Sequence, residues 1–263
     1  MVASKMLPGH GKLRLGTQGF AFDDWVGPFY PPETPKSAYL ERYAENFDTV
    51  EIDSTFYGTP RPSVVRNWRD RTPEDFAFAA KFPRAITHDK KLESAEAEAA
   101  EFIEVMQALG DKLAVLTLQF AHDFGPENRD RLEGFLDGLP AGVRYAVEIR
   151  NRAWLARDFV EGLSARGVAL VLQDLHYMPR LDWRTAGFTV IRWLGRRSDV
   201  ERFDRLQIDR TRDLTTWAHR VRAFLEEGTD VFGYFNNHYA GHSPGSVRLF
   251  ESLIGKPAKT RRA

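Results

Sequence analysis

Cysteine is absent from this chain of 263 residues. Its absence excludes disulfide bonds, thiolate nucleophiles, iron–sulfur clusters and cysteine-rich zinc sites. Long apolar runs are missing too: no stretch approaches the ~18 apolar residues of a membrane span, and the first twelve residues contain no apolar signal core. We therefore expect a cytoplasmic protein with no membrane partner.

An excess of charge of either sign is also lacking, because 37 basic residues balance 37 acidic ones. Zero net charge argues against bulk electrostatic capture by nucleic acid. Two segments, 61–71 and 192–212, are locally basic, but acidic residues are interleaved with their arginines. We interpret both segments as solvated helix and loop faces, with a rim that binds nucleic-acid phosphates as the alternative.

The chain does contain short apolar runs separated by helical patterns. Runs suited to β-strands lie at 13–17, 49–52, 76–81, 113–119, 145–150, 168–174, 189–193 and 231–236. Helical periodicity follows most of them, at 37–47, 93–110, 127–138, 158–167, 214–228 and 244–254. Segment 176–187 contains a proline and has no helical period, so we expect a loop in place of a helix after the sixth strand.

This alternation predicts an α/β fold, namely a single TIM-type (β/α) barrel of parallel strands over residues 13–255. Residues 1–12 would form an N-terminal tail, and residues 256–263 a basic C-terminal tail. A doubly wound open sheet is the alternative. It is disfavoured because GTQGF at 16–20 lacks the spacing of a glycine-rich dinucleotide loop.

The tripeptide Val-Glu-Ile occurs twice, at 50–52 and 147–149, inside runs that otherwise resemble buried strands. Strand side chains alternate between faces, so Glu51 and Glu148 lie opposite their apolar neighbours. A buried carboxylate needs a counter-charge or hydrogen bonds. We therefore expect the two glutamates to converge on each other, on a ligand or on trapped water.

Polar side chains lie at or just beyond the carboxyl end of every predicted strand. They are Gln18, Glu51, Asp53, Lys81, Gln119, Glu148, Arg150, Asp174, Arg192, Asn236 and Asn237. In a TIM-type barrel these ends share one rim, which is where active sites of such barrels lie. Arginine and lysine bind phosphate or carboxylate groups, and neighbouring carboxylates can divide acid and base roles. The alternative is an internal salt-bridge network that only fills the barrel.

Aromatic and histidine residues follow some of these strands. Trp25 and Tyr57 could wall a pocket and stack on a sugar or nucleobase, or they could be loop packing. His88 follows the third strand and is a candidate for proton transfer. His238 and His242 have a spacing seen in metal sites, but Ser243-Pro244 favours a loop that enters a helix. No metal ligand is assigned.

In its strand-end motifs the chain resembles the YecE-like family, which carries a domain-of-unknown-function label. The matching segments, in order, are GTQGF, VEIDSTFY, FAFAAK with ITH, LQF, VEIRNRAW and FNN. The resemblance implies a TIM-type barrel and brings no established reaction. Its motif positions are Glu51, Tyr57, Lys81, His88, Gln119, Glu148, Arg150, Trp154, Arg192, Asn236 and Asn237. The chain departs from the family pattern at Asp53, Asn151, Leu194 and Phe120-Ala121.

We expect an enzyme, by default a hydrolase, that acts on a small anionic substrate, phosphorylated or sugar-like, at the barrel mouth. Glu51, Glu148 and His88 are its candidate catalytic residues. The candidate binding residues are Lys81, Arg150, Arg192, Gln119, Asn236, Asn237, Trp25, Tyr57, Gln18, Asp53 and Asp174. The sequence requires no cofactor. The alternatives are a phosphodiesterase or nucleic-acid-processing barrel assisted by a divalent metal, and a non-catalytic metabolite-binding barrel.

Overall fold

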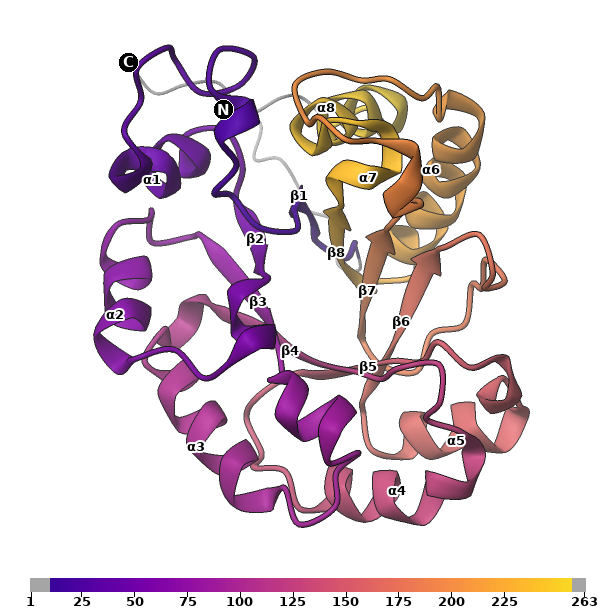
Figure 1. The fold of residues 1–263 in the computed structure, drawn as a ribbon. Coiled ribbons are helices and arrows are strands. Elements are labelled where there is room, and N and C mark those ends of the chain that lie inside the picture. The colour runs from indigo at the N-terminus through magenta and orange to yellow at the C-terminus, as the bar shows by residue number, and fades with distance from the viewer. Residues whose placement is uncertain (1–9, 257–263) are drawn as a thin grey trace, which may run out of the picture.

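The computed structural model describes residues 10–256 and contains an eight-stranded parallel sheet (Figure 1). The strands are β1 Leu13–Thr17, β2 Thr49–Ile52, β3 Ala77–Lys81, β4 Leu113–Gln119, β5 Tyr145–Glu148, β6 Ala169–Asp174, β7 Phe188–Trp193 and β8 Asp230–Phe235. Their hydrogen-bonded order is β1-β8-β7-β6-β5-β4-β3-β2. This order confirms the predicted TIM-type barrel, and each strand overlaps a predicted run.

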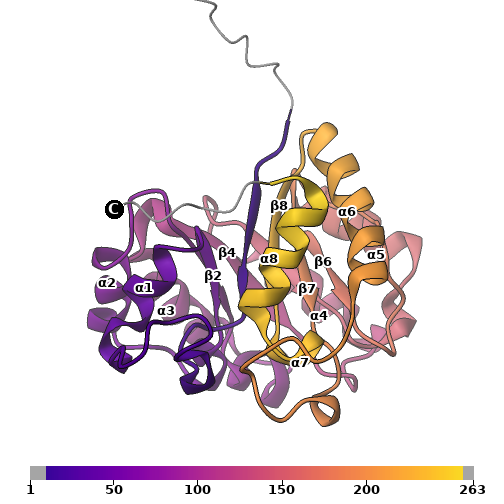
Figure 2. The same cartoon turned by 90° about the horizontal axis from the view of Figure 1, so that it is seen from above.

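Helices surround this sheet on the outside (Figures 1 and 2). They are α1 Tyr39–Ala44, α2 Pro62–Asp70, α3 Glu96–Gln107, α4 Arg129–Asp137, α5 Arg157–Ala165, α6 Thr211–Glu226, α7 Asn237–Ala240 and α8 Ser243–Ile254. The predicted loop after the sixth strand is confirmed, because β6 and β7 have no helix between them. The sequence prediction omitted α2, whose apolar residues are few: only Val65 and Trp68 are buried.

The barrel is nearly closed, and a tyrosine hydroxyl joins its two end strands. The Tyr43 hydroxyl accepts a hydrogen bond from the Thr17 backbone N–H of β1 at 2.9 Å and donates to the Thr49 carbonyl of β2 at 2.9 Å. One bridge, Gln18 to Glu51, pairs the chain just beyond β1 with β2. A side chain at Gly16 would place its Cβ 2.1 Å from the Thr49 carbonyl oxygen. Glycine is therefore required where β1 passes β2.

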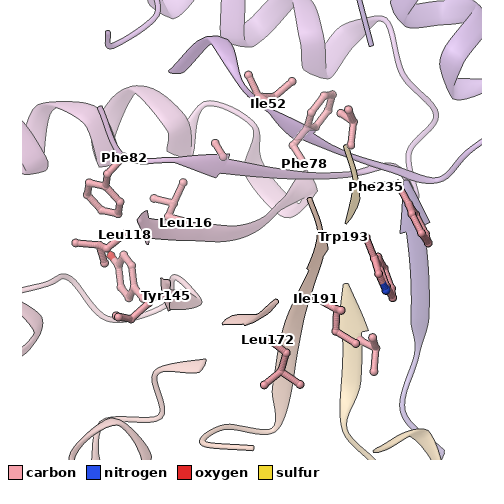
Figure 3. Packing of buried hydrophobic residues seen from close by; sticks show 14 of the residues in the cluster. Ile52, Phe78, Phe82, Leu116, Leu118, Tyr145, Leu172, Ile191, Trp193 and Phe235 are labelled. Carbon is pink, nitrogen blue, oxygen red and sulfur yellow. The ribbon is translucent and has the colours of Figure 1, made fainter. Parts of the chain in front are cut away.

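Strand alternation sorts the core into two sets of side chains. Bulky residues of the outer strand faces, such as Leu116, Leu118 and Ile191, pack under the helices (Figure 3). The inner set is smaller and contains Ala77, Ala79, Ala114, Val115, Ala146, Ala169, Val171, Phe188, Val190, Phe232 and Tyr234. Polar side chains continue this inner face toward the carboxyl ends of the strands. Apolar and polar positions therefore alternate between the two faces in β3, β4 and β7.

The predicted tails fall almost wholly outside the described residues, which begin at 10 and end at 256. Within that range, no helix combines the length and apolarity needed to cross a membrane. The loop that follows β7, drawn in orange, lies with α7 at the lower edge of Figure 2, beyond the carboxyl ends of the strands. This end of the barrel carries the polar strand ends predicted from the sequence.

Candidate functional site

A single guanidinium connects both repeated glutamates in the interior of the barrel. Arg192, at the end of β7, donates through Nε to Oε2 of Glu51 at 3.1 Å, and its Nη2 lies 2.9 Å from the same oxygen. Its Nη1 donates to Oε2 of Glu148. All three residues are at least 99% buried. Glu51 and Glu148 therefore converge, as the sequence predicts, and they do so on a shared arginine.

The two glutamates have opposite shifts in pKa. Burial raises the pKa of Glu51, and the nearby charges of Arg192 and Lys81 oppose this only in part. Burial acts in the same direction on Glu148, but there Arg192 and Arg150 outweigh it and lower the pKa to about 2. Glu148 is held as a carboxylate, whereas Glu51 favours its protonated form more than an ordinary glutamate does.

Two further cations stand beside this interior group. Arg150 donates through Nε to Oε1 of Glu148 at 2.9 Å, so both oxygens of Glu148 are bound by arginines. Lys81 Nζ forms an ion pair with Oδ1 of Asp53 at 2.6 Å and lies 5.2 Å from the centroid of the Phe56 ring. Arg150 uses only Nε in these contacts, and its terminal nitrogens have no acceptor within the described part of the chain.

A cavity of about 760 Å³ opens above this group at the barrel mouth. Its lining includes, among others, the predicted residues Gln18, Asp53, Tyr57, Lys81, His88, Gln119, Arg150, Arg192 and Asn236. Glu51 and Glu148 are fully buried and do not line it; they lie behind the arginines that do. Substrate in this cavity would therefore meet the arginines first and the glutamates only through them.

His88 occupies the wall of the cavity and is about half buried. Arg192 Nη1 donates to Oε1 of Gln119 at 3.4 Å, which directs the Gln119 amide nitrogen toward Nε2 of His88 at 3.5 Å. Since an amide nitrogen only donates, Nε2 must accept, and the ring proton lies on Nδ1, beside the Thr87 hydroxyl at 2.9 Å. Burial and the charges of Arg150 and Arg84 lower the pKa of His88. His88 is therefore a neutral imidazole at neutral pH.

Three of the predicted binding residues lie outside the cavity. Trp25 is fully buried in an aromatic cluster and donates through Nε1 to Oδ1 of Asn237 at 3.2 Å. Asn237 also accepts from the backbone and hydroxyl of Ser243, so it anchors the start of α8. Asp174 accepts hydrogen bonds from Arg180, Trp217 and Tyr239 and lines a smaller cavity of about 280 Å³. Trp25, Asn237 and Asp174 therefore form contacts that hold loops and helices together.

Tyr57 has the position expected of a pocket wall. Its side chain lines the cavity and is 84% exposed, on the short helical turn that follows β2. The Phe56 ring beside it packs edge-on against the His88 ring, with centroids 5.0 Å apart. The aromatic pair thus places a flat, accessible ring at the mouth and a second ring against the imidazole.

The cavity also contains residues that the sequence predictions did not name for this site. They come from the loops after β6, β7 and β8 and include His176, Tyr177, Gly195, Arg196, Arg197, Ser198 and His238. The sequence did contain a signal for this segment: residues 194–198 directly follow the strand that carries Arg192, so they lie at the barrel mouth. The segment was instead interpreted as part of a solvated basic face, since its arginines alternate with acidic residues farther along.

The histidine pair near the C-terminus has separate structural roles. Nδ1 of His242 accepts a hydrogen bond from the backbone N–H of Gly245 at 3.2 Å, so His242 caps the N-terminus of α8. Burial lowers the pKa of His242 to about 4. His238 lies on α7 and lines the large cavity. Across residues 10–256, no group of three histidine, aspartate or glutamate side chains has the geometry to hold a metal ion.

Comparison with known proteins gives a consistent result. The model of a family described as "Protein of unknown function DUF72" matches residues 14–263. The UPF0759 protein YecE of Escherichia coli is 38% identical over 140 residues, which cover 51% of this chain and 52% of that protein. The UPF0759 protein YunF of Bacillus subtilis is 27% identical over 157 residues, which cover 57% of this chain and 54% of that protein. These matches span about half the length of the curated relatives.

Solved structures extend the similarity over nearly the whole chain. A DUF72 family protein from Thermotoga maritima superposes with a TM-score of 0.79 at 26% identity, over 93% of this chain and 99% of that one. A DUF72 family protein from Enterococcus faecalis gives a TM-score of 0.77 at 21% identity, over 95% and 99%. The second likeness concerns the fold alone. Neither relative is described by a reaction.

Proposed function

The chain belongs to the DUF72 family of proteins of unknown function, and we propose that it is an enzyme acting on a small anionic substrate at the mouth of its barrel. The observation that carries this proposal is the charge of the 760 Å³ cavity, whose lining contains five lysine and arginine side chains but one carboxylate, Asp53. Even with the buried Glu51 and Glu148 included, cations outnumber carboxylates. Such a cavity favours an anionic ligand.

Hydrogen-bond donors at the floor would orient this anion. The terminal nitrogens of Arg150 are free of protein acceptors among the described residues, and the Lys81 ammonium, which carries three hydrogens, forms one ion pair there, with Asp53. The rigid placement of Arg150 and Arg192 comes from Glu148, which holds one guanidinium on each oxygen. We assign Glu148 to positioning these arginines, because each of its oxygens binds a guanidinium group and its lowered pKa keeps it ionised.

Proton transfer at the cavity would fall to His88, with Glu51 behind the arginines as a buried carboxyl group that does not reach the substrate. His88 is a neutral base on the cavity wall, and among residues 10–256 its Nε2 has only the long 3.5 Å contact with Gln119, which a water molecule could replace. Glu51 is the carboxyl group whose raised pKa suits it to hold a proton behind Arg192. A base that activates water, next to cations that stabilise developing negative charge, favours hydrolysis as the reaction class.

The test is a turnover screen on phosphomonoesters, sugar phosphates and glycosides with the wild-type chain and two histidine variants. His88→Gln should lower kcat on an accepted substrate by roughly 10²–10⁴-fold and remove the acidic limb of the pH profile. His219→Gln, on the exposed face of α6, should leave kcat unchanged. Unchanged turnover in His88→Gln would remove this residue from the mechanism. A bound metabolite without turnover of any substrate would favour a non-catalytic barrel.

A further inference from the structure

The loop that follows β7 brings two arginines to the outer part of the same cavity. Arg196 and Arg197 come three and four residues after the end of β7, and both line the cavity with exposed side chains. Within residues 10–256, neither forms an ion pair or a side-chain hydrogen bond, whereas most arginines of the fold do. We refer to Arg196 and Arg197 as the rim pair.

The rim pair carries the excess positive charge of the cavity. At the floor, Lys81 is paired with Asp53, Arg150 with Glu148, and Arg192 with both glutamates. Three cations therefore face three carboxylates, and the floor approaches neutrality when Glu51 is ionised. Arg196 and Arg197 form no ion pair among residues 10–256, and Asp174 and Asp199, the carboxylates that line a smaller cavity with Arg196, do not line this one. An anionic group entering the cavity is attracted mainly toward Arg196 and Arg197.

The backbone holds this loop at the mouth. Gly195 has a positive φ of 69°, and a Cβ at this position would lie 2.1 Å from the carbonyl oxygen of His238 on α7. The loop therefore rests directly on the α7 backbone. Arg197 is an electrostatic neighbour of His238, because its charge adds to burial in lowering the pKa of that imidazole. A loop anchored in this way presents its arginines in a restricted region.

The same place in the fold is often used for phosphate. TIM-type barrels frequently bind phosphate with the loops after strands seven and eight and the N-terminus of a short extra helix. Here the first turn of α7 has its own cap, because Oδ1 of Asn236 accepts the His238 backbone N–H at 2.9 Å. This amide is therefore already satisfied. Guanidinium groups on the loop after β7, which contacts α7, are donors suited to a phosphate at this end.

We propose that Arg196 and Arg197 form a second anion subsite, which binds a phosphate group at the end of the substrate remote from His88. The inference rests on the proposed function and extends it, since it makes the substrate a phosphate-tagged molecule whose reacting end lies at the floor. The rim pair would hold the phosphate without taking part in the chemistry. The rim pair would increase the affinity for the substrate and orient it.

The test uses inorganic phosphate as the probe, titrated into the full chain by calorimetry and by NMR of the histidine rings. R196Q/R197Q should weaken phosphate binding by at least about tenfold and abolish the phosphate-induced shift of the His238 resonance. R202Q/R205Q is the matched control: both arginines lie on the same segment, pair with Asp204 and do not line the cavity. It should bind phosphate as the wild type does.

Unchanged phosphate affinity in R196Q/R197Q, or wild-type protein that binds no phosphate, would overturn the subsite. Loss of phosphate binding in R150Q but not in R196Q/R197Q would place the anion at the floor, which overturns the subsite and leaves the proposed function standing. The experiment also separates failure of the proposed function from failure of the subsite. Phosphate binding that depends on the rim pair, with no turnover in the substrate screen, would retain the subsite and contradict the enzymatic proposal.

Discussion

Oε2 of Glu51 lies 2.9 Å from Nη2 of Arg192, while its other oxygen, Oε1, is buried and has no hydrogen-bond partner among the described residues. One half of this carboxyl group is therefore stabilised by charge and the other half is desolvated without compensation. The raised pKa of Glu51 follows from this imbalance. Proton binding at Glu51 then adjusts the charge of the floor.

Glu51→Gln should change how stability depends on pH. Because the folded-state pKa of Glu51 is raised, protonation of Glu51 stabilises the folded state. This stabilisation is complete below the ordinary carboxyl pKa and is lost as pH rises through the folded-state pKa. Glutamine mimics the protonated form at every pH. The free energy of unfolding of the variant, relative to wild type, should therefore increase from pH 4 to pH 8. Urea titrations across this range measure it, and a decreasing difference would contradict the raised pKa.

Glu148→Gln should be strongly destabilising at neutral pH. The substitution replaces the carboxylate that pairs with the buried Arg192 by a neutral amide, and it removes the ion pair that anchors Arg150. We expect the free energy of unfolding to fall by about 3–5 kcal/mol. Because the folded-state pKa of Glu148 is lowered, its contribution to stability is fully present at pH values above the unfolded carboxyl pKa. This contribution is lost as pH falls through the folded-state pKa of about 2. Glu161→Gln, in an exposed pair with Arg157, should cost less than about 1 kcal/mol in the same denaturation experiment.

Tyr43→Phe should weaken the junction between β1 and β2. The variant leaves the Thr17 N–H and the Thr49 carbonyl without their shared partner, which costs roughly 1–3 kcal/mol. Hydrogen exchange at the Thr17 amide should accelerate more than at amides of the opposite side of the barrel. Tyr39→Phe is the control, because that hydroxyl donates to the exposed carboxylate of Asp23 and does not join two strands. Equal protection at Thr17 in both variants would show that the hydroxyl does not join the strands.

Asp53→Asn should increase the affinity for inorganic phosphate by roughly three- to tenfold, because it removes the only carboxylate that lines the described cavity and frees the Lys81 ammonium. The increase should diminish as salt is added. Asp123→Asn removes an equivalent charge from the exposed pair with Lys91, outside the cavity, and should leave phosphate affinity unchanged. A lower affinity in Asp53→Asn, measured by calorimetry, would contradict an anion site at the floor.

Strand periodicity was sufficient to predict the barrel and the convergence of its polar strand ends. The period of two assigns each inner side chain to a layer, so Glu51, Lys81, Glu148 and Arg192 could be grouped without coordinates. The repeated Val-Glu-Ile tripeptide was informative for the same reason. A carboxylate in an otherwise apolar strand requires a counter-charge, and Arg192 supplies one to both glutamates.

Details that depend on loop paths could not be predicted in this way. Trp25 follows a strand end as Tyr57 does, yet the Trp25 ring is fully buried against Phe29 and Tyr30, whereas the Tyr57 ring is 84% exposed. The rim pair was assigned to a solvated face since its place at the cavity is set by the contact of Gly195 with α7, far along the chain. Periodicity gives no information about such contacts.

The most direct test of the anionic site is a crystal structure of the protein grown with inorganic phosphate. The account predicts phosphate in the 760 Å³ cavity, within hydrogen-bonding distance of the terminal nitrogens of Arg150 or of the rim pair. Phosphate bound only on other surfaces, with the cavity left to water at saturating phosphate, would contradict it.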